Sequence, residues 1–192
     1  MTHLSLVLGS SSARRKDLLS RIGVTPDRIS SPDIDETPRK GEIGRDYALR
    51  MAQEKAAAIA RADNEIIIAG DTSVVVGRRI LQQAEDHDMQ RGFLELLRGR
   101  RHNVYSAVAV VDCQGNMQSK LSTTSVKFKR LSASEIDDYI QSDEGLGKAG
   151  GYAIQGRAEA LISWMQGSHS GVIGLPLYEA RILLKNAGYP LG

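Results

Sequence analysis

The chain has 192 residues, a length that suits one sizeable domain, and we expect a single domain over residues 1–192. Its apolar fraction of 41% predicts an ordinary globular fold, and its formal net charge of +2 argues against a dedicated nucleic-acid-binding protein. A single cysteine, Cys113, excludes an intrachain disulfide and a thiolate metal site.

The predicted elements of the first half, in chain order, are a strand at 4–8, a helix ended by Gly23, an irregular stretch at 26–44, an alanine-rich helix at 46–62, and apolar strand runs at 66–69 and 74–76. The segment Gly70-Asp71-Thr72 lies between these two runs and predicts an interruption of the strand. A tight turn at Gly77 then leads into Ile80 and Leu81.

The predicted elements of the second half are a helix at 86–98, an antiparallel pair at 103–111 and 120–130, a helix from Ser132 to about Gln141, a glycine-rich loop at 143–156, a strand at 160–165 and a last helix from Pro176 to Gly188. This alternation without a strict repeat predicts an α/β fold with a long mixed sheet flanked by helices. No linker separates domains, and two lobes around a cleft fit the pattern.

The sequence also bears on the compartment. Residues 1–4 lack the charged segment and apolar core that begin a signal peptide. The longest apolar stretches are shorter than the about 20 residues that cross a bilayer. We therefore expect a cytoplasmic protein with no membrane partner.

The first candidate site is the strand-to-helix segment from Gly9 to Arg15. Its small residues let the backbone approach an anion, and free N–H groups at a helix start attract phosphate. Ser10 and Ser12 add hydroxyl donors, while Arg14 and Arg15 supply charge and forked hydrogen bonding. The Gly-Lys-Ser/Thr ending of a Walker A loop is missing. The alternative is an ordinary helix cap followed by a solvated basic turn.

Asp71 is the most informative residue, because it lies within a run of apolar strand residues. A buried carboxylate costs free energy unless it is paired, hydrogen-bonded or bound to a metal. Carboxylates suit Mg²⁺ or Mn²⁺ beside phosphate oxygens, and a free one can accept the proton of an attacking water. The less favoured alternative is a turn residue at a strand end. Asp33, Asp35 and Glu36 are further acids, and for Asp33 and Asp35 a solvated loop is the preferred interpretation.

Two weaker candidates lie on other predicted elements. Lys55 belongs to the alanine-rich helix, where a lysine alone is most simply part of a solvated face. The loop from Lys148 to Gly156 predicts either a segment that closes over a ligand or a flexible surface connection. Gln155 in this loop offers both a donor and an acceptor to the edge of a base.

Together these segments resemble the Maf family of nucleotide pyrophosphatases, nearly from end to end. Residues 8–15 are similar to the family's Leu-Ala-Ser-x-Ser-Pro-Arg-Arg opening. The other matching motifs, in order, are Asp35-Glu36-Thr37, Glu54-Lys55-Ala56, Gly70-Asp71-Thr72, residues 148–156 and Gly174-Leu175-Pro176-Leu177.

The resemblance implies a mixed sheet with a cleft between two lobes, often in a homodimer. It also implies hydrolysis of a nucleoside triphosphate to its monophosphate and pyrophosphate, with Asp71 as proton acceptor and a divalent cation, Mg²⁺ or Mn²⁺, held by Glu36 and Asp71. The residues that would bind the triphosphate are Ser10, Arg14, Arg15 and Lys55. The residues that would select the substrate are Arg14, Thr72 and Gln155. The Ile-Gln-Gly setting of Gln155 is similar to the branch that acts on dTTP and UTP rather than on 7-methyl-GTP.

Four positions depart from the family pattern: Gln83 replaces a Lys, Ala13 a Pro, Gly147 an Asp and Gly171 an Asn. Gln83 removes a phosphate-binding cation and motivates an alternative function, a catalytically weakened nucleotide-binding regulatory protein linked to cell division. A third hypothesis, a nucleic-acid-binding regulator of division, fits poorly with the near-neutral charge.

Overall fold

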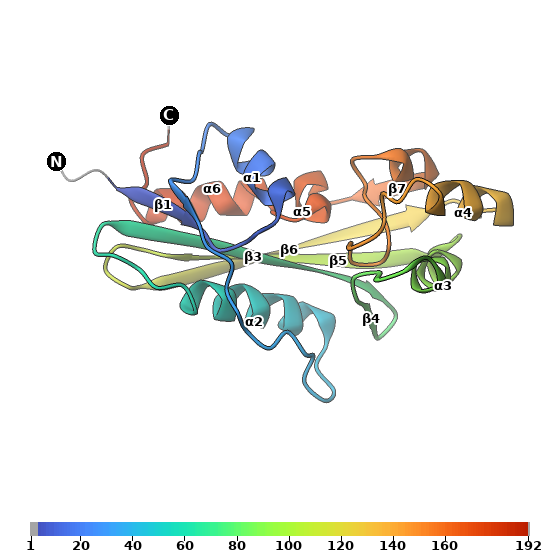
Figure 1. Cartoon of the computed structure of the whole chain (residues 1–192), viewed down its shortest axis with the longest axis horizontal. Coiled ribbons are helices and arrows are strands. Elements are labelled where there is room, and N and C mark those ends of the chain that lie inside the picture. The colour runs from blue at the N-terminus through green and yellow to red at the C-terminus, as the bar shows by residue number, and fades with distance from the viewer. Residues whose placement is uncertain (1–3, 192) are drawn as a thin grey trace.

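A seven-stranded mixed sheet runs through the centre of the molecule (Figure 1). The computed structural model describes residues 4–191. Residues 1–3, on which part of the signal-peptide expectation rests, and residue 192 lie outside this range. Within the described range, no helix is both long and apolar enough to cross a membrane.

The sheet combines a parallel edge with a long antiparallel part, as the sequence predicts. Its order is β2-β1-β3-β5-β6-β7, with β4 paired to the outer part of β3. Strand β1 is parallel to β2 and β3, and the remaining pairs are antiparallel. The strands are β1 (Ser5–Leu8), β2 (Arg28–Ile29), β3 (Glu65–Val76), β4 (Arg79–Leu81), β5 (Arg101–Val111), β6 (Met117–Phe128) and β7 (Ile162–Gln166).

Helices cover both faces of the sheet (Figure 1). Helix α2 lies on one face, while α1, α5 and α6 lie on the other, where the larger core is mostly Leu, Ile and Val. Helices α3 and α4 pack on each other. The helices are α1 (Ala13–Ser20), α2 (Gly44–Ala57), α3 (His87–Leu97), α4 (Ala133–Ile140), α5 (His169–Ile173) and α6 (Leu177–Asn186), with a 3₁₀ helix at Arg157–Leu161.

Helix α2 approaches the sheet closely because its inward face is small. Ala48, Ala52 and Ala56 recur at every fourth residue and are buried. They belong to a second core cluster with strand residues of β1, β3 and β5, namely Val7, Ile67, Ala69, Ala107, Ala109 and Val111. This close packing brings the last turn of α2, which carries Lys55, against the middle of β3.

Strand β3 is continuous from Glu65 to Val76, so the predicted interruption at residues 70–72 is wrong. Asp71 takes its place in the ladder directly opposite Ala107 of β5. The physical reason is that Lys55 reaches across from α2 and pairs with the Asp71 carboxylate. A charge that is paired from another element does not have to leave the strand.

Other boundaries also differ from the sequence-based expectation. Helix α2 begins at Gly44 and ends at Ala57 rather than at residue 62, because the following residues return the chain to the start of β3 beside β1. The short elements β2, α5 and the 3₁₀ helix were not expected. The capping box of Ser132 and Glu135 at α4 is confirmed, as is the turn at Gly77, whose φ is +61°.

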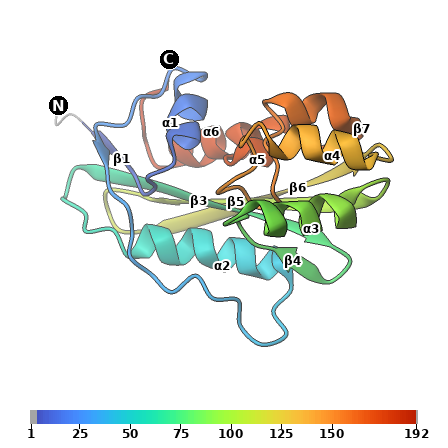
Figure 2. The same ribbon diagram turned by 45° about the vertical axis from the view of Figure 1, so that its right-hand side comes forward.

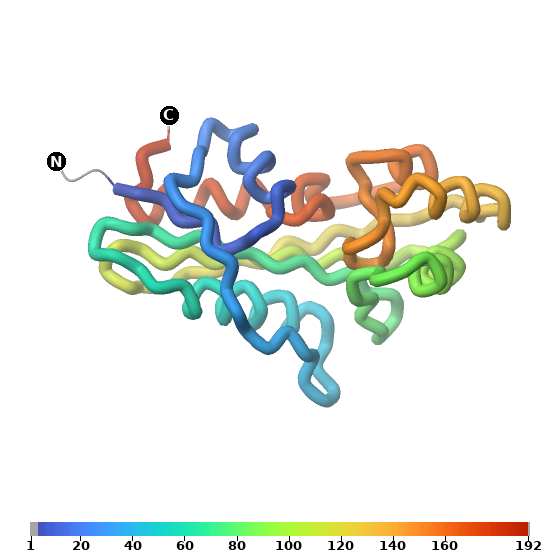
Figure 3. Tube along the Cα trace, in the orientation of Figure 1, coloured from blue at the N-terminus to red at the C-terminus, as the bar shows by residue number. Residues whose placement is uncertain are grey.

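Two irregular segments shape the region above the middle of β3. Residues 30–43 leave β2, cross the sheet from the α1 side and reach the start of α2 (Figures 2 and 3). The loop at 143–156 descends onto the sheet near β4 (Figure 3). It is held there by isolated bridges that pair Gln83 with Ala149 and Ala84 with Leu146.

Candidate active site

The turn between β1 and α1 holds an arginine in a fixed position. Ser10 is 5% exposed, and its Oγ accepts hydrogen bonds from the Ser12 N–H at 3.2 Å and from Arg15 Nη1 at 2.8 Å. Arg15 Nε donates to the carbonyl oxygen of Gly174 at 2.9 Å, which ties this turn to the end of α5. Two of the donor nitrogens of Arg15 are therefore committed to the protein, and the position of its guanidinium is set before any ligand binds.

The start of α1 is also free of the groups that usually neutralise a helix N-terminus. Ser12 makes no side-chain capping bond, and no acidic residue lies in the first turn of this fully described helix. The positive end of the helix dipole is therefore left for an anion. Burial, then the charge of Arg15, lowers the pKa of Arg14. The pKa of Arg15 is also lowered by burial, while the charges of Asp71 and Glu36 act in the opposite direction.

A lysine joins two carboxylates at the floor of the site. Lys55 Nζ donates to Asp71 Oδ1 at 2.8 Å and to Glu36 Oε2 at 2.7 Å. Lys55 and Asp71 are 8% and 7% exposed, whereas about half of the Glu36 side chain, 48%, is exposed. The Tyr47 hydroxyl of α2 donates to the Glu36 carbonyl oxygen at 2.9 Å and holds the Glu36 backbone in place. Lys55 is thus part of the site and not of a solvated helix face.

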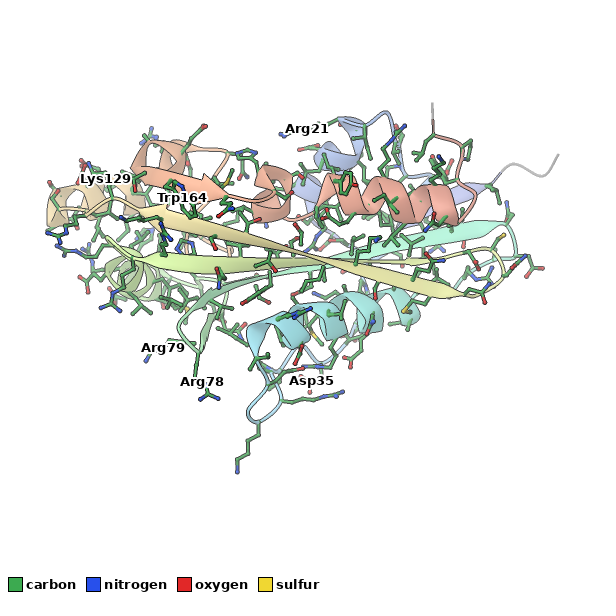
Figure 4. All side chains as sticks on the ribbon, turned by 180° about the vertical axis from the view of Figure 1, so that it is seen from behind. Arg21, Asp35, Arg78, Arg79, Lys129 and Trp164 are labelled. Atoms are coloured by element: carbon green, nitrogen blue, oxygen red, sulfur yellow. The ribbon has the colours of Figure 1, made fainter. Side chains whose placement is uncertain are left out.

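Glu36 reaches the floor, but the two acids before it do not. Asp33 and Asp35 are exposed and do not line the cavity described below. Asp35 lies beneath α2, away from the sheet (Figure 4), and accepts a hydrogen bond from the Thr37 N–H at 2.9 Å. Hydrogen bonding from Thr37 lowers the pKa of Asp35. The interpretation of Asp33 and Asp35 as solvated loop residues is confirmed.

A cavity of about 360 Å³ lies above this floor. All eight residues to which the family resemblance gives a role line it: Ser10, Arg14, Arg15, Glu36, Lys55, Asp71, Thr72 and Gln155. Its lining holds four cations, these being Arg14, Arg15, Lys55 and Lys148, against the two carboxylates of Glu36 and Asp71. The surplus of two positive charges (four minus two) favours an anionic ligand.

Part of the cavity lining is suited to a base rather than to phosphate. Thr72 lies on the opposite face of β3 from Asp71, because side chains alternate along a strand. Its Oγ1 is 3.0 Å from the Oγ of the fully buried Ser106. Gln155 is exposed, and Val172 and Ile173 add apolar lining. The combination offers hydrogen bonding beside an apolar surface, as recognition of a planar base requires.

The loop at 143–156 supplies a cation that the sequence reasoning did not single out. Lys148 lines the cavity, and its Nζ donates to the Leu146 carbonyl oxygen at 3.1 Å within the same loop. Burial, then the charge of Arg14, lowers the pKa of Lys148. Gln83 lines the same cavity beside the loop, so Lys148 provides positive charge near the position where Gln83 is neutral. The available signal was its place as the first residue of a glycine-rich segment.

The remaining departures from the family pattern have different surroundings. Ala13 and Gly147 line the cavity. Gly171 lies in α5, where its N–H donates to Ser168 Oγ at 3.0 Å. A Cβ at Gly171 would lie 3.2 Å from Ser168 Oγ, so a larger residue there needs a shift of Ser168.

The carboxylates of Glu36 and Asp71 offer oxygen ligands for a cation. No group of three or more His, Cys, Asp or Glu side chains among the described residues is placed to hold a metal ion. Mg²⁺ in phosphate sites is commonly held by one or two carboxylates together with substrate phosphates and water. The two carboxylates at the cavity floor fit this pattern, and they do not fit a site formed by protein ligands alone.

Comparison with known proteins shows which family this chain is similar to. The sequence profile of the family described as Maf-like protein matches residues 5–187. A protein of Sphingopyxis alaskensis named dTTP/UTP pyrophosphatase is 57% identical over 188 residues, which cover 98% of this chain and 99% of that protein. A protein of Novosphingobium aromaticivorans with the same name is 56% identical over 184 residues, covering 95% of this chain and 92% of that protein.

Among solved structures, the crystal structure of a nucleoside-triphosphatase, or dITP/XTP pyrophosphatase, from Mycobacterium abscessus matches with a TM-score of 0.42 and 20% identity, over 68% of this chain and 76% of that one. The profile match covers nearly the whole described chain, and the relatives are well above 30% identical over almost their full length. This chain belongs to the Maf family.

Proposed function

We propose that this chain hydrolyses nucleoside triphosphates to the monophosphate and pyrophosphate, with dTTP and UTP as preferred substrates. The observation that carries the proposal is the buried Asp71–Lys55 pair at the floor of a cavity with a surplus of positive charge. The names of the relatives, dTTP/UTP pyrophosphatase, support the same reaction.

The triphosphate is bound by cationic and hydroxyl groups of the cavity lining. Ser10, Arg14, Arg15 and Lys148 face the cavity from the β1–α1 turn and the loop at 143–156. Because Arg15 is already held by Ser10 and Gly174, it binds phosphate without first losing conformational freedom. Charge-assisted hydrogen bonds of this kind are about twice as strong as neutral ones.

Asp71 accepts the proton of the attacking water. The water oxygen forms a bond to the α-phosphorus, and the bond from that phosphorus to the oxygen bridging to the β-phosphate breaks. The electron pair of the broken bond leaves with pyrophosphate, and the proton lost by water goes to Asp71. Lys55 orients the Asp71 carboxylate through Oδ1, which leaves Oδ2 for the proton.

Glu36 and Asp71 would hold a divalent cation, Mg²⁺ or Mn²⁺, which supplies charge neutralisation at the phosphate oxygens when bound. The exposed half of Glu36 makes this carboxylate the one free to turn toward an ion. We expect EDTA to abolish pyrophosphate release and added Mg²⁺ to restore it, measured on one preparation.

Substrate selection falls to the part of the cavity lining that holds Thr72 and Gln155. A Gln side chain both donates and accepts, which matches the N3–H donor and the neighbouring carbonyl acceptor of uracil and thymine. Arg14 lines the same cavity. We therefore expect kcat/KM to be higher for dTTP and UTP than for 7-methyl-GTP.

A substrate panel tests the proposal. Purified protein is incubated with UTP, dTTP, CTP and 7-methyl-GTP plus Mg²⁺, and pyrophosphate release is measured. Asp71→Asn should lower kcat by about 10²- to 10⁴-fold, the usual contribution of a positioned proton acceptor. Asp33→Asn, an exposed acid outside the cavity, is the matched control and should leave kcat unchanged. Full activity in Asp71→Asn would exclude this mechanism.

The neutral Gln83 motivates the alternative of a nucleotide-binding regulatory protein with weakened turnover. That function predicts nucleotide-dependent thermal stabilisation without pyrophosphate release, and recovered turnover in Gln83→Lys. Hydrolysis by the parent at an ordinary enzymatic rate would exclude it.

Assembly and location complete the proposal. We expect a homodimer, as the family resemblance implies, and a cytoplasmic location. Light scattering during size-exclusion chromatography measures the oligomeric state, and cell fractionation measures the location.

A further inference from the structure

A second cavity, of about 400 Å³, adjoins the first. The two share part of their lining, including Glu36, Asp71 and Thr72. The second cavity extends along the α2 face of the sheet, where Tyr47 of α2 and Ser73 of β3 line it. Asp71 therefore lines both cavities.

The two cavities differ in charge. The first is lined by Arg14, Arg15, Lys55 and Lys148. Among the described residues, the second is lined by no Lys or Arg, while its acids are Glu36, Asp71 and Glu85. The pKa of Tyr47 is raised by burial and then by the negative charges of Asp71 and Glu36, in agreement with a negative potential on this side. Phosphate is favoured in the first cavity and repelled from the second.

Ser73 lines the second cavity, and its buried hydroxyl is unpaired. It is 2% exposed, and its Oγ has no hydrogen-bond partner among the described residues. Ser73 lies two residues after Asp71 on the same face of β3, with α-carbons about 7 Å apart. A buried hydroxyl without a partner lowers stability, and such a group in a native fold calls for an explanation such as a bound water or a catalytic role.

We propose that the second cavity is the water side of the active site, and that Ser73 and Asp71 together hold the attacking water. The inference rests on the proposed hydrolysis. Each side chain accepts one O–H of the water, which leaves an oxygen lone pair to form the bond to the α-phosphorus in the first cavity. The proton goes to Asp71, the bond to the bridging oxygen breaks, and pyrophosphate stays on the cationic side until release. Ser73 retains its own proton throughout.

Ser73→Ala tests the inference through a split between kcat and KM. We expect kcat for dTTP to fall about tenfold, the size of one lost hydrogen bond, with KM within twofold of the parent. The midpoint of thermal unfolding should stay or rise, because the variant removes an unpaired buried hydroxyl. Ser73→Thr keeps the hydroxyl and should recover most of kcat. Ser122→Ala is the matched control, since Ser122 is 8% exposed and lines neither cavity.

A second measurement separates water from phosphate as the partner of Ser73. Affinity for α,β-imido-dTTP should be equal in the parent and in Ser73→Ala, because Ser73 does not contact the phosphates. A tenfold loss of this affinity, or a kcat within twofold of the parent, would overturn the inference while leaving the proposed function standing. A parent that releases no pyrophosphate from any nucleotide would instead remove the proposed function and this inference with it.

Discussion

The two walls of the first cavity are built in different ways. On one wall, Arg15 is bound to Ser10 and to the Gly174 backbone, and Lys55 is buried between two carboxylates. We call this the fixed wall. On the other wall, the loop wall, Lys148 donates to a carbonyl of its own loop, and Gln155 is exposed. The loop turns at Gly147, Gly150 and Gly151, whose φ angles of +66°, +70° and +70° suit glycine.

The difference separates reaction from selection. The groups proposed to carry the reaction lie on a strand, a helix and a helix start, where packing and hydrogen bonds fix them before substrate binds. The groups on the loop are held through backbone hydrogen bonds to residues 82–84, and loops commonly adjust to a ligand more readily than helices and strands do. Substitutions on the first wall should therefore change stability or kcat, and those on the loop should change KM.

The largest effect is expected for Lys55→Met. Removing the lysine leaves Asp71 buried without its partner, and we expect the free energy of unfolding to fall by about 3–5 kcal/mol. The half-exposed Glu36 should contribute little of this. Urea unfolding followed by circular dichroism measures the change.

Two variants sharpen this test. Lys55→Met combined with Asp71→Asn should recover part of the loss, since no buried charge then remains unpaired. Arg39→Met breaks an exposed ion pair with Glu54 and should cost less than about 1 kcal/mol. Equal stability of the parent and Lys55→Met would contradict the view that this pair holds the floor of the site.

The next largest effect is a pH-dependent loss of stability at His102, which contacts Tyr152 of the loop at 143–156. His102 lies within hydrogen-bonding distance of the Tyr152 hydroxyl, 2.8 Å, and its ring stacks on Phe128. Burial lowers the pKa of His102 to about 4. The pKa of His102 is therefore lower in the folded protein than in the unfolded chain. As a result, the contribution of neutral His102 to the free energy of unfolding is fully present above about pH 6.5 and is lost as the pH falls toward 4.

At pH 5 this loss should be about 2 kcal/mol relative to pH 7.5. His102→Gln keeps a hydrogen-bonding group for Tyr152 but does not titrate, so its free energy of unfolding should change less between these two pH values. Carboxylates with lowered pKa, such as Glu42 at about 2, act only at lower pH. An equal loss in the parent and in His102→Gln would rule out His102 as the source.

Arg15→Lys tests the proposed binding of phosphate by the guanidinium of Arg15. A lysine cannot donate to Ser10 and Gly174 while also presenting a planar fork to phosphate. We expect kcat/KM to fall about thirtyfold, or about 2 kcal/mol, from the loss of charge-assisted hydrogen bonds. Arg21→Lys is the control, because Arg21 is exposed and extends into solvent at the end of α1 (Figure 4). A kcat/KM for Arg15→Lys equal to that of the parent would mean that Arg15 acts only through its positive charge.

The two walls also differ in how far the sequence predicted them. Ser10, Arg14, Arg15 and Asp71 were predicted because each has a local signal, a cluster of small and basic residues at a helix start or an acid within an apolar run. The pairing of Lys55 with two carboxylates was not predicted, because it joins residues 16 and 19 positions apart through the packing of α2 on the sheet.

The same limit explains the errors. An acid within apolar residues was interpreted as a break in β3, because the cation that pairs with it lies on another element. Ser73 gave no signal, since a serine in a strand becomes informative only when its neighbours across the fold are known. Strand β2 and helix α5 are too short for a hydrophobic period to develop.

Lys148→Met should have the smallest effect and isolates the loop wall. The lysine lines the cavity from the loop at 143–156, so its loss should raise KM for dTTP about tenfold, or about 1.4 kcal/mol, and change kcat less. The free energy of unfolding should stay within about 0.5 kcal/mol, in contrast to Lys55→Met. Lys120→Met, at an exposed position of β6 that lines neither cavity, controls for the loss of one positive charge. If Lys148→Met lowered kcat and left KM unchanged, the loop would belong with the fixed wall, and the separation of reaction from selection would be lost.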